Sequence, residues 1–337
     1  MLQIQNRRYI GNKYKLLDFI RNTLYQIGVD FNTICDIFSG TGVVGNYFLQ
    51  QDKNVIFNDI LYSNFVIYNA WFSKEKYNTS KINQYLNYYN NSKNYIIDNY
   101  FNQTFSGTYF SENNARQLGS IRKHLEEHKS DLNEREFYIL LTSLLYTTDR
   151  IANTVGHFEA FLSQMPIDKE INLQPLEIQK FNSNVIIYNQ DANKLIKQLR
   201  CDLLYLDPPY NARQYVNFYH VLENLAEWKQ PEVFGKTLKM ERENKMSDYS
   251  KVKAKNVLQD LIQNADCKYI LLSYNNTYQA KSGATINKVT KNEITEILCK
   301  VGNVQIFEEK YKCFNSGKTD FGNKHKELLY FVERNKQ

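Results

Sequence analysis

The sequence predicts an α/β fold whose core is interrupted by a long helical insertion. Near its start, the chain reads as a strand at 33–38, a glycine-rich turn, a short helix and a strand at 55–57, which together begin a βαβ unit. The alternation then stops, and helical segments are separated by polar, Asn-rich stretches before strand-like runs resume. We therefore expect one α/β domain made of residues 1–60 and 182–337, and a helical insertion over 61–181.

The remaining elements follow from the spacing of apolar residues. A stripe of leucine and isoleucine side chains at helical spacing predicts a helix over 13–26. Apolar runs typical of strands occur at 185–188, 201–206, 269–274, 304–310 and 327–332. The last two runs flank a polar, glycine-containing loop at 315–323, so we expect them to pair as an antiparallel hairpin at a sheet edge.

The composition is typical of a globular protein with a large core. Of the 337 residues, 42% are hydrophobic and 23% are charged. No apolar stretch approaches membrane-spanning length and the first residues contain no signal-peptide segment, so we expect a cytoplasmic protein without a membrane partner. The five cysteines are scattered without a CxxC pair, as is usual for reduced thiols. The net charge of +6 is compatible with a polyanionic partner but does not establish one.

A glycine-rich turn follows the first strand. The segment 40–45 (GTGVVG) fits GxGxxG between a strand and a helix, and Asp59 stands at the end of the next strand. Glycines such as Gly40 and Gly42 let a ligand approach the backbone, and a carboxylate at the second strand end accepts hydrogen bonds from ribose hydroxyls. Both a nicotinamide dinucleotide and S-adenosylmethionine carry an adenosine, so the turn leaves both cofactors open. A glycine turn that only closes a strand–helix joint is the third alternative.

A second motif follows the apolar run at 201–206. The segment 207–210 (DPPY) places a carboxylate, Asp207, at the carboxyl end of a strand, where open α/β sheets bind their ligands. Two prolines stiffen the backbone behind Asp207, and the ring of Tyr210 follows. This arrangement suits a flat, amine-bearing ring such as adenine. The alternative is a strand-terminating turn, in which Asp and Pro are ordinary residues.

Three further side chains are weaker candidates. Asp191 follows the strand at 185–188, where it could accept a hydrogen bond from an adenine amine, cap the next helix, or do both. Tyr9 and Lys13 flank a glycine turn before a helix, where Lys13 could bind the carboxylate of an amino acid; the alternative is a solvated lysine at a helix start.

Two other patterns carry less weight. His124 and His128 lie four residues apart but lack a third ligand nearby, so we expect a solvated helix face and no metal site. Directly after the DPPY segment, Asn211 could cap the helix that contains Tyr219, which would turn Arg213 and Gln214 toward the mouth of the site. The alternative is that these are surface polar residues on a first helical turn.

In their order along the chain, these motifs closely resemble those of the adenine-specific DNA methyltransferases. That family runs from an amino-terminal cofactor box through FxGxG and a target-recognition insertion to DPPY. The matching stretches are RYIGNK at 8–13, DIFSGTG at 36–42, ND at 58–59, QDA at 190–192 and DPPY at 207–210. The likeness covers the α/β core from both ends but not the insertion.

The resemblance implies a Rossmann-like, S-adenosylmethionine-dependent methyltransferase sheet, mostly parallel with an antiparallel last hairpin, and an inserted helical target-recognition subdomain. The implied donor is S-adenosylmethionine, which leaves as S-adenosylhomocysteine. The implied cofactor-binding residues are Tyr9, Lys13, Phe38, Gly40, Gly42, Asp59, Asp191 and Asp207. The implied catalytic residues are Asp207, Pro208 and Tyr210.

The implied reaction is site-specific methylation of adenine N6. The acceptor would be a base flipped out of double-stranded DNA, and the enzyme a monomer in a restriction–modification system whose endonuclease acts separately. The insertion is the expected place for DNA reading. Within it we favour the segment 147–162, and the candidate contacts are Arg116, Arg122, Arg150, Asn153 and His157.

Four other functions use part of the same pattern. An RNA adenine methyltransferase would need the same core, and a cytosine-amine methyltransferase usually has Ser in place of Asp207. A nicotinamide-dependent oxidoreductase accounts for the glycine turn and Asp59 but leaves the DPPY segment without a purpose. A non-catalytic DNA-binding module would need no carboxylate at the end of the strand 201–206.

Overall fold

The computed structural model describes residues 1–91, 97–277, 286–310 and 326–335. The chain forms two compact units. Unit 1 contains Met1–Gly11, Leu61–Lys180 and Val216–Asn244, and unit 2 contains Asn12–Ile60, Phe181–Tyr215 and Lys245–Gln337. The predicted insertion therefore lies in unit 1, but two segments that we had placed in the α/β domain, Met1–Gly11 and Val216–Asn244, group with it.

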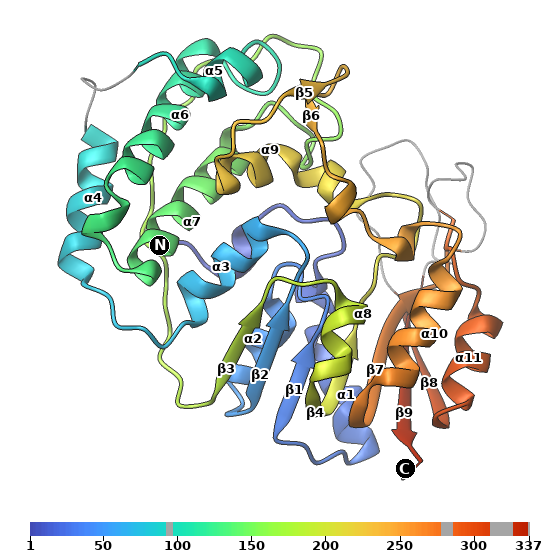
Figure 1. Cartoon of the computed structure of the whole chain (residues 1–337). Coiled ribbons are helices and arrows are strands. Elements are labelled where there is room, and N and C mark those ends of the chain that lie inside the picture. Colours follow the sequence, from blue (N-terminus) through green and yellow to red (C-terminus); the bar gives the residue numbers. More distant parts are fainter. Residues whose placement is uncertain (92–96, 278–285, 311–325, 336–337) are drawn as a thin grey trace. The chain divides into compact units, whose positions relative to one another are not determined.

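Unit 2 is built on one mixed sheet (Figure 1). Its strands are β1 (Thr33–Asp36), β2 (Asn54–Asn58), β3 (Val185–Tyr188), β4 (Arg200–Leu206), β7 (Asp266–Asn275), β8 (Gly302–Lys310) and β9 (Lys326–Arg334). Among the described residues they are arranged in the order β3–β2–β1–β4–β7–β9–β8. The neighbouring strands β3, β2, β1, β4 and β7 are parallel to one another. β9 is antiparallel to both β7 and β8.

This arrangement confirms the predicted mostly parallel sheet and its antiparallel last hairpin. β4 reads as an almost continuous apolar run because it lies inside the sheet between β1 and β7, covered on both faces. β8 forms the sheet edge, as expected, while β9 is inserted between β7 and β8. The predicted loop 315–323 lies outside the described residues.

Helices cover both faces of the sheet in unit 2 (Figure 1). They are η2 (Lys13–Leu16), α1 (Leu17–Ile27), α2 (Val43–Leu49), α8 (Ala192–Leu195), η4 (Ile196–Gln198), η6 (Asp248–Ser250), α10 (Ala254–Asn264) and α11 (Lys291–Cys299). Helices α8, α10 and α11 share one apolar core with the sheet, which includes Leu204, Ile270 and Tyr330. Figure 1 shows α1 and α2 on the other face.

Unit 1 is mainly helical. Its elements are η1 (Ile4–Asn6), α3 (Tyr62–Phe72), α4 (Thr79–Asn91), α5 (Tyr100–Phe105), α6 (Glu112–Glu127), η3 (Lys129–Asp131), α7 (Glu134–Ile151), α9 (Tyr215–Glu227) and the ribbon β5 (Val233–Phe234) with β6 (Lys239–Met240); η5 (Glu243–Lys245) follows where the units meet in sequence. Helix α7 is the central helix, since it packs against α3, α4 and α6 and most of its side chains are buried. It begins with a capping box in which Asn133 and Glu136 exchange hydrogen bonds.

Of the two alternatives for Asn211, the helix cap was wrong. Its Oδ1 accepts a hydrogen bond of 3.0 Å from the Arg213 amide, which closes a local turn, and α9 begins only at Tyr215. The ribbon β5–β6 was not predicted, because its strands contain only two residues each and offer no alternating pattern to detect.

The third glycine of the turn, Gly45, is required by packing. It lies in α2, and a Cβ atom at this position would stand 2.2 Å from Cε1 of Phe57, whose ring is fully buried in β2. Only glycine therefore allows α2 to lie this close to β2, the strand that Asp59 follows.

We expect Gly45→Ala to destabilise the protein by about 1–3 kcal/mol, because the Phe57 ring has no room to move away. The urea midpoint should fall at an unchanged slope. Asn46→Ala, one position further along the same helix and half-buried, is the matched control and should stay within about 0.5 kcal/mol of the wild type. An unchanged midpoint for Gly45→Ala would show that the helix can shift without cost.

Candidate functional site

The predicted site residues of unit 2 follow four neighbouring strands. Strands β3, β2, β1 and β4 are parallel and adjacent, so their carboxyl ends lie along one edge of the sheet. Asp191, Asp59, the glycine turn at 39–42 and Asp207 come after these strands in that order. The chain order reverses between β1 and β4, and this switch point is where open α/β sheets bind ligands.

The glycine turn is fixed to the loop after β2. Gly40 and Gly42 have φ values of 53° and 76°, in the left-handed region that favours glycine. The Gly40 amide donates a hydrogen bond of 3.0 Å to Oδ2 of Asp59. The turn therefore exposes backbone rather than side chains, and it holds Asp59 in a defined position.

Asn58 is a positioning residue that the sequence analysis did not single out. Its buried side-chain amide donates hydrogen bonds of 3.0 Å to the carbonyls of Ile37 and Gln190, and its Oδ1 accepts one of 3.0 Å from the Gln190 amide. One side chain thus ties together the loops after β1, β2 and β3. The ND pair in the sequence marked this position, but its role depends on contacts 21 and 132 residues away.

Asp191 and Phe38 flank the same edge. Asp191 is exposed and caps α8, since Oδ1 accepts a hydrogen bond of 3.0 Å from the Lys194 amide. The capping alternative is therefore confirmed, and a contact of Asp191 with a cofactor stays a prediction. Phe38 is half-buried and packs edge-on against Tyr249, with ring centroids 5.0 Å apart.

Lys13 is paired with two carboxylates. Its Nζ lies 3.0 Å from Oδ1 of Asp207 and 3.0 Å from Oε1 of Glu327, and only 6% of its side chain is exposed. The pKa of Lys13 is raised well above its ordinary value: burial lowers it, but the charges of Asp207 and Glu327 outweigh burial. The alternative of a solvated lysine was therefore wrong, because Lys13 is buried between two carboxylates of its own unit. A contact of Lys13 with the carboxylate of the cofactor stays a prediction.

Burial changes the acidity of Asp207. It raises the pKa of this carboxyl from 3.8 to about 6; Lys13 opposes the rise and Glu327 adds to it. Asp36, a further buried carboxyl at the end of β1, has its pKa raised well above the ordinary value by burial and by the charge of Asp207. The sequence analysis missed Asp36 and Glu327 as parts of the site.

The loop that carries Tyr210 is anchored on both sides. The Tyr210 carbonyl accepts a hydrogen bond of 2.7 Å from the Lys288 amide, and its ring packs edge-on against Tyr274 at 5.4 Å. Further along, Gln214 exchanges two hydrogen bonds with the backbone of Ser247. The segment after β4 therefore holds Asp207 and the ring of Tyr210 in place.

Tyr9 belongs to unit 1. Its ring stacks on Tyr219 with centroids 4.6 Å apart and planes 3° apart, and the guanidinium of Arg7 lies 5.2 Å from the centroid of the Tyr9 ring. The buried Arg7 also donates to Oδ1 of Asn64. The role of Tyr9 in cofactor binding stays a prediction.

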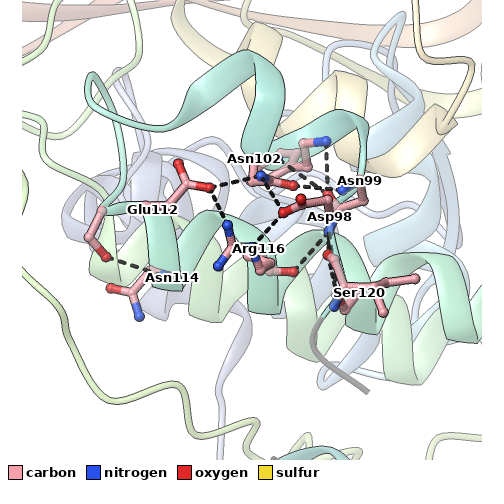
Figure 2. A network of polar contacts seen from close by, with 10 residues as sticks. Asp98, Asn99, Asn102, Glu112, Asn114, Arg116 and Ser120 are labelled. Carbon is pink, nitrogen blue, oxygen red and sulfur yellow. Dashed lines mark hydrogen bonds and ion pairs between the residues drawn. The ribbon is translucent and has the colours of Figure 1, made fainter. Parts of the chain in front are cut away.

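Two of the arginines suggested as DNA contacts are engaged within unit 1. Figure 2 shows Arg116 in a polar network, with ion pairs of 2.7 Å to Asp98 and 2.9 Å to Glu112. Arg122 is 2% exposed and donates to the backbone carbonyls of Leu225 and Ala226. The suggestion of Arg122 as a DNA contact was therefore wrong, because the helix turns this side chain inward.

Asn153 is also engaged within unit 1. Its side-chain amide donates to the carbonyls of Thr108, Leu162 and Gln164. It fixes the favoured segment 147–162 to the loop before α6, so the shape of that segment depends on it.

Two further features concern membrane-spanning helices and metal ligands among the described residues. None of its helices combines the length and the apolar character needed to cross a membrane. Within the same residues, no three His, Cys, Asp or Glu side chains are grouped as a metal site requires. The rings of His124 and His128 stack on each other, with centroids 3.9 Å apart.

Comparisons with known proteins show which family the chain is similar to. A family model described as D12 class N6 adenine-specific DNA methyltransferase matches residues 9–314. The chain is 32% identical to the type II methyltransferase M.NlaIII of Neisseria lactamica over 342 residues, covering 97% of this chain and 99% of that protein. It is 34% identical to the modification methylase StsI of Streptococcus sanguinis over 351 residues, covering 97% of this chain and 52% of that protein.

Proposed function

The chain belongs to the D12 class N6 adenine-specific DNA methyltransferase family, and from this premise we propose that it is the modification enzyme of a restriction–modification system. It methylates adenine N6 at a specific site in double-stranded DNA, with S-adenosylmethionine as methyl donor. The names of the type II and modification methylases that it resembles support the restriction–modification role. The observation that carries the proposal is the row of Asp59, the glycine turn and Asp207 along one sheet edge.

The residues of unit 2 fit S-adenosylmethionine. Side-chain-free backbone at Gly40 and Gly42 leaves room for a ligand beside the half-buried carboxylate of Asp59, with the exposed Asp191 one strand further out. Asp59 would hold the ribose and Asp191 the adenine, while Phe38, Gly40 and Gly42 would pack under the methionine part. Lys13 and Tyr9 remain predicted contacts of that part. When bound, the cofactor supplies a methyl group already activated by a sulfonium.

Asp207 and Pro208 act on the acceptor nitrogen. The exocyclic amine of adenine is a poor nucleophile, because its lone pair is delocalised into the ring. Hydrogen bonds from this amine to the Asp207 carboxylate and the Pro208 carbonyl favour a tetrahedral nitrogen and so free the lone pair. As N6 gains its fourth bond it must lose a proton, and a carboxylate whose pKa is raised to about 6 is a suitable acceptor.

Tyr210 holds the target base. A base inside a duplex cannot reach the sheet edge, so it must be flipped out, and a ring beside Asp207 can stack on it. The anchored backbone of Tyr210 keeps this ring in place before DNA arrives.

DNA recognition is assigned to the insertion 61–181, which lies in unit 1. The segment 147–162 remains the favoured part, and it contains the exposed candidate Arg150. We further propose that the enzyme is a monomer acting on cytoplasmic DNA and that the endonuclease of the system is a separate protein.

The proposal is tested by methylation-sensitive sequencing of DNA from a host that expresses the protein. N6-methyladenine should appear at one short sequence and should be absent from a host that expresses Asp207→Ala. In a purified system, labelled methyl groups should enter duplex DNA and not a transcript of the same sequence. Transfer to RNA alone, or methylation of cytosine, would overturn the proposal.

We expect Tyr210→Ala to lower kcat/KM for DNA about 10- to 100-fold, because stacking on one base contributes roughly 1–3 kcal/mol. Tyr210→Phe should recover most of this loss, and binding of S-adenosylmethionine should be unchanged. Tyr25→Ala removes a ring that is 88% exposed on α1 and serves as the control. Equal activity of Tyr210→Ala and the wild type would rule out the stacking role.

A further inference from the structure

A second carboxylate contacts the cation that faces Asp207. Glu327 lies near the start of β9, only 3% exposed, and its Oε1 is 3.0 Å from Nζ of Lys13. Lys13 also lies 3.0 Å from Asp207. The site therefore contains a row of carboxylate, ammonium and carboxylate in which Lys13 and Glu327 are buried and Asp207 is partly exposed, and the proposed mechanism uses only Asp207.

Glu327 is itself held in place. The Ser273 hydroxyl donates a hydrogen bond of 2.8 Å to Oε1 of Glu327, and Ser273 is 1% exposed. In the antiparallel pair β7–β9, Glu327 stands opposite Asn275, so Ser273 is its diagonal neighbour on the same face of the sheet. The same oxygen thus accepts from Ser273 and faces Lys13, which fixes the distance between Glu327 and the cation.

Burying Glu327 has an electrostatic cost that the fold alone does not require. One buried ion pair, Lys13 with Asp207, would already be neutral; a third charge brings the row to a net charge of −1. A lone ammonium would draw the negative charge of Asp207 toward itself and weaken that carboxylate as a hydrogen-bond acceptor. Sharing the ammonium with Glu327 reverses part of this effect.

We propose that Glu327 is a positioning residue for the methyl-transfer reaction: it orients Lys13 and shares its charge, so that Asp207 remains a strong acceptor for the adenine amine. This inference rests on the proposed role of Asp207. It agrees with the pKa of Asp207, which the charge of Glu327 raises and that of Lys13 lowers.

Several other groups face this row. They are Asp36 from β1, Tyr205 from β4, and Tyr210 and Tyr215 from the loop after β4 and the start of α9. Burial raises the pKa of Tyr205 and of Tyr215 well above 10.0, so these phenols stay neutral at neutral pH. Asp36 is not substituted in any of the variants, so it does not cause differences between them.

The test is the pH dependence of kcat in Glu327→Gln, which removes the charge at nearly constant shape. In the wild type, kcat should fall as the pH drops through about 6, because Asp207 must be ionised to accept from the amine. Without the charge of Glu327, the pKa of Asp207 falls, and this acid limb should move down by roughly 0.5–1 pH unit. At pH 8, kcat should drop several-fold, with KM for S-adenosylmethionine within twofold of the wild type.

Three variants make the result specific. Glu333→Gln removes the same charge from an exposed position on the same strand and should leave the acid limb in place. Glu327→Asp keeps the charge and should return the limb to within about 0.3 unit of the wild type. Ser273→Ala removes the hydroxyl that holds Glu327 in place, so it should lower kcat two- to tenfold. It keeps all charges, so the acid limb should not move.

Each outcome decides between the alternatives. A wild-type acid limb in a folded Glu327→Gln that still binds S-adenosylmethionine would overturn the inference. If Glu327→Gln does not fold, the inference is tested by Ser273→Ala instead. An unchanged kcat in Ser273→Ala would also overturn the inference. If Asp207→Asn itself kept near-normal activity, the proposed function of Asp207 would fail instead, so the two failures can be told apart.

Discussion

Asp207→Ala is expected to lower the rate of methyl transfer at least about 1,000-fold, because it removes an acceptor that acts on the nitrogen in the transition state. The fold should be largely spared, since Lys13 keeps Glu327 as an ion-pair partner. The measurement is single-turnover transfer of labelled methyl groups to a duplex that carries the recognition site. Affinity for S-adenosylmethionine, measured by calorimetry, should stay within about fivefold of the wild type, a difference of roughly 1 kcal/mol.

Asp266→Ala is the matched control for this experiment. Asp266 is an exposed aspartate at the start of β7, in the same sheet but at the opposite end of the strands, and its ion pair with Arg200 is long, at 3.9 Å. It should retain wild-type turnover. Near-normal turnover in Asp207→Ala would remove Asp207 from the mechanism.

Lys13→Met should destabilise the protein by about 3–5 kcal/mol near pH 8, because it leaves two buried carboxylates without their cation. The free energy of unfolding is measured by urea titration. Lys15→Met is the control, since Lys15 lies two residues away and is exposed; it should change stability by less than about 0.5 kcal/mol.

The loss should shrink on acidification. Asp207 has an ordinary pKa of 3.8 and a folded-state pKa of about 6, which must rise further when Lys13 is removed. A carboxyl whose pKa is higher in the folded state binds protons on folding, so its unfavourable contribution fades as the pH falls from 8 through 6 toward 4. A loss that grew with acidity would contradict this account.

A second substitution should restore stability. In Lys13→Met with Glu327→Gln, only one of the two carboxylates that Lys13 contacts keeps its charge, so at least half of the lost free energy should return. Failure to recover stability would show that Lys13 matters through packing of its side chain rather than through its charge.

Local patterns predicted much of unit 2. The apolar run of β4, the glycine turn and the DPPY segment each depend on neighbours within a few residues, so the sequence displays them directly. The row of carboxyl ends then follows from parallel pairing alone. The sequence alone therefore predicts that Asp59 and Asp207 lie at one edge of the sheet.

Other features depend on contacts that the sequence does not display. Glu327 meets Lys13 only because β9 pairs with β7 rather than continuing beyond β8. Arg122 sits in a charged stretch that reads as a solvated helix face, yet its guanidinium lies 5.3 Å from the centroid of Trp228 and is buried by residues about 100 positions away. Val216–Asn244 joins unit 1 for a similar reason: its partners are distant in the chain.

The insertion of β9 between β7 and β8 also bears on the timing of synthesis. Translation delivers Glu327 after every other strand of the sheet and some 120 codons after Asp207. A nascent chain that already displays the glycine turn and the DPPY segment still lacks the strand between β7 and β8 and, with it, the carboxylate that shares Lys13 with Asp207. Unfinished polypeptides released from the ribosome would thus carry an incomplete site, and DNA modification would be left to full-length molecules.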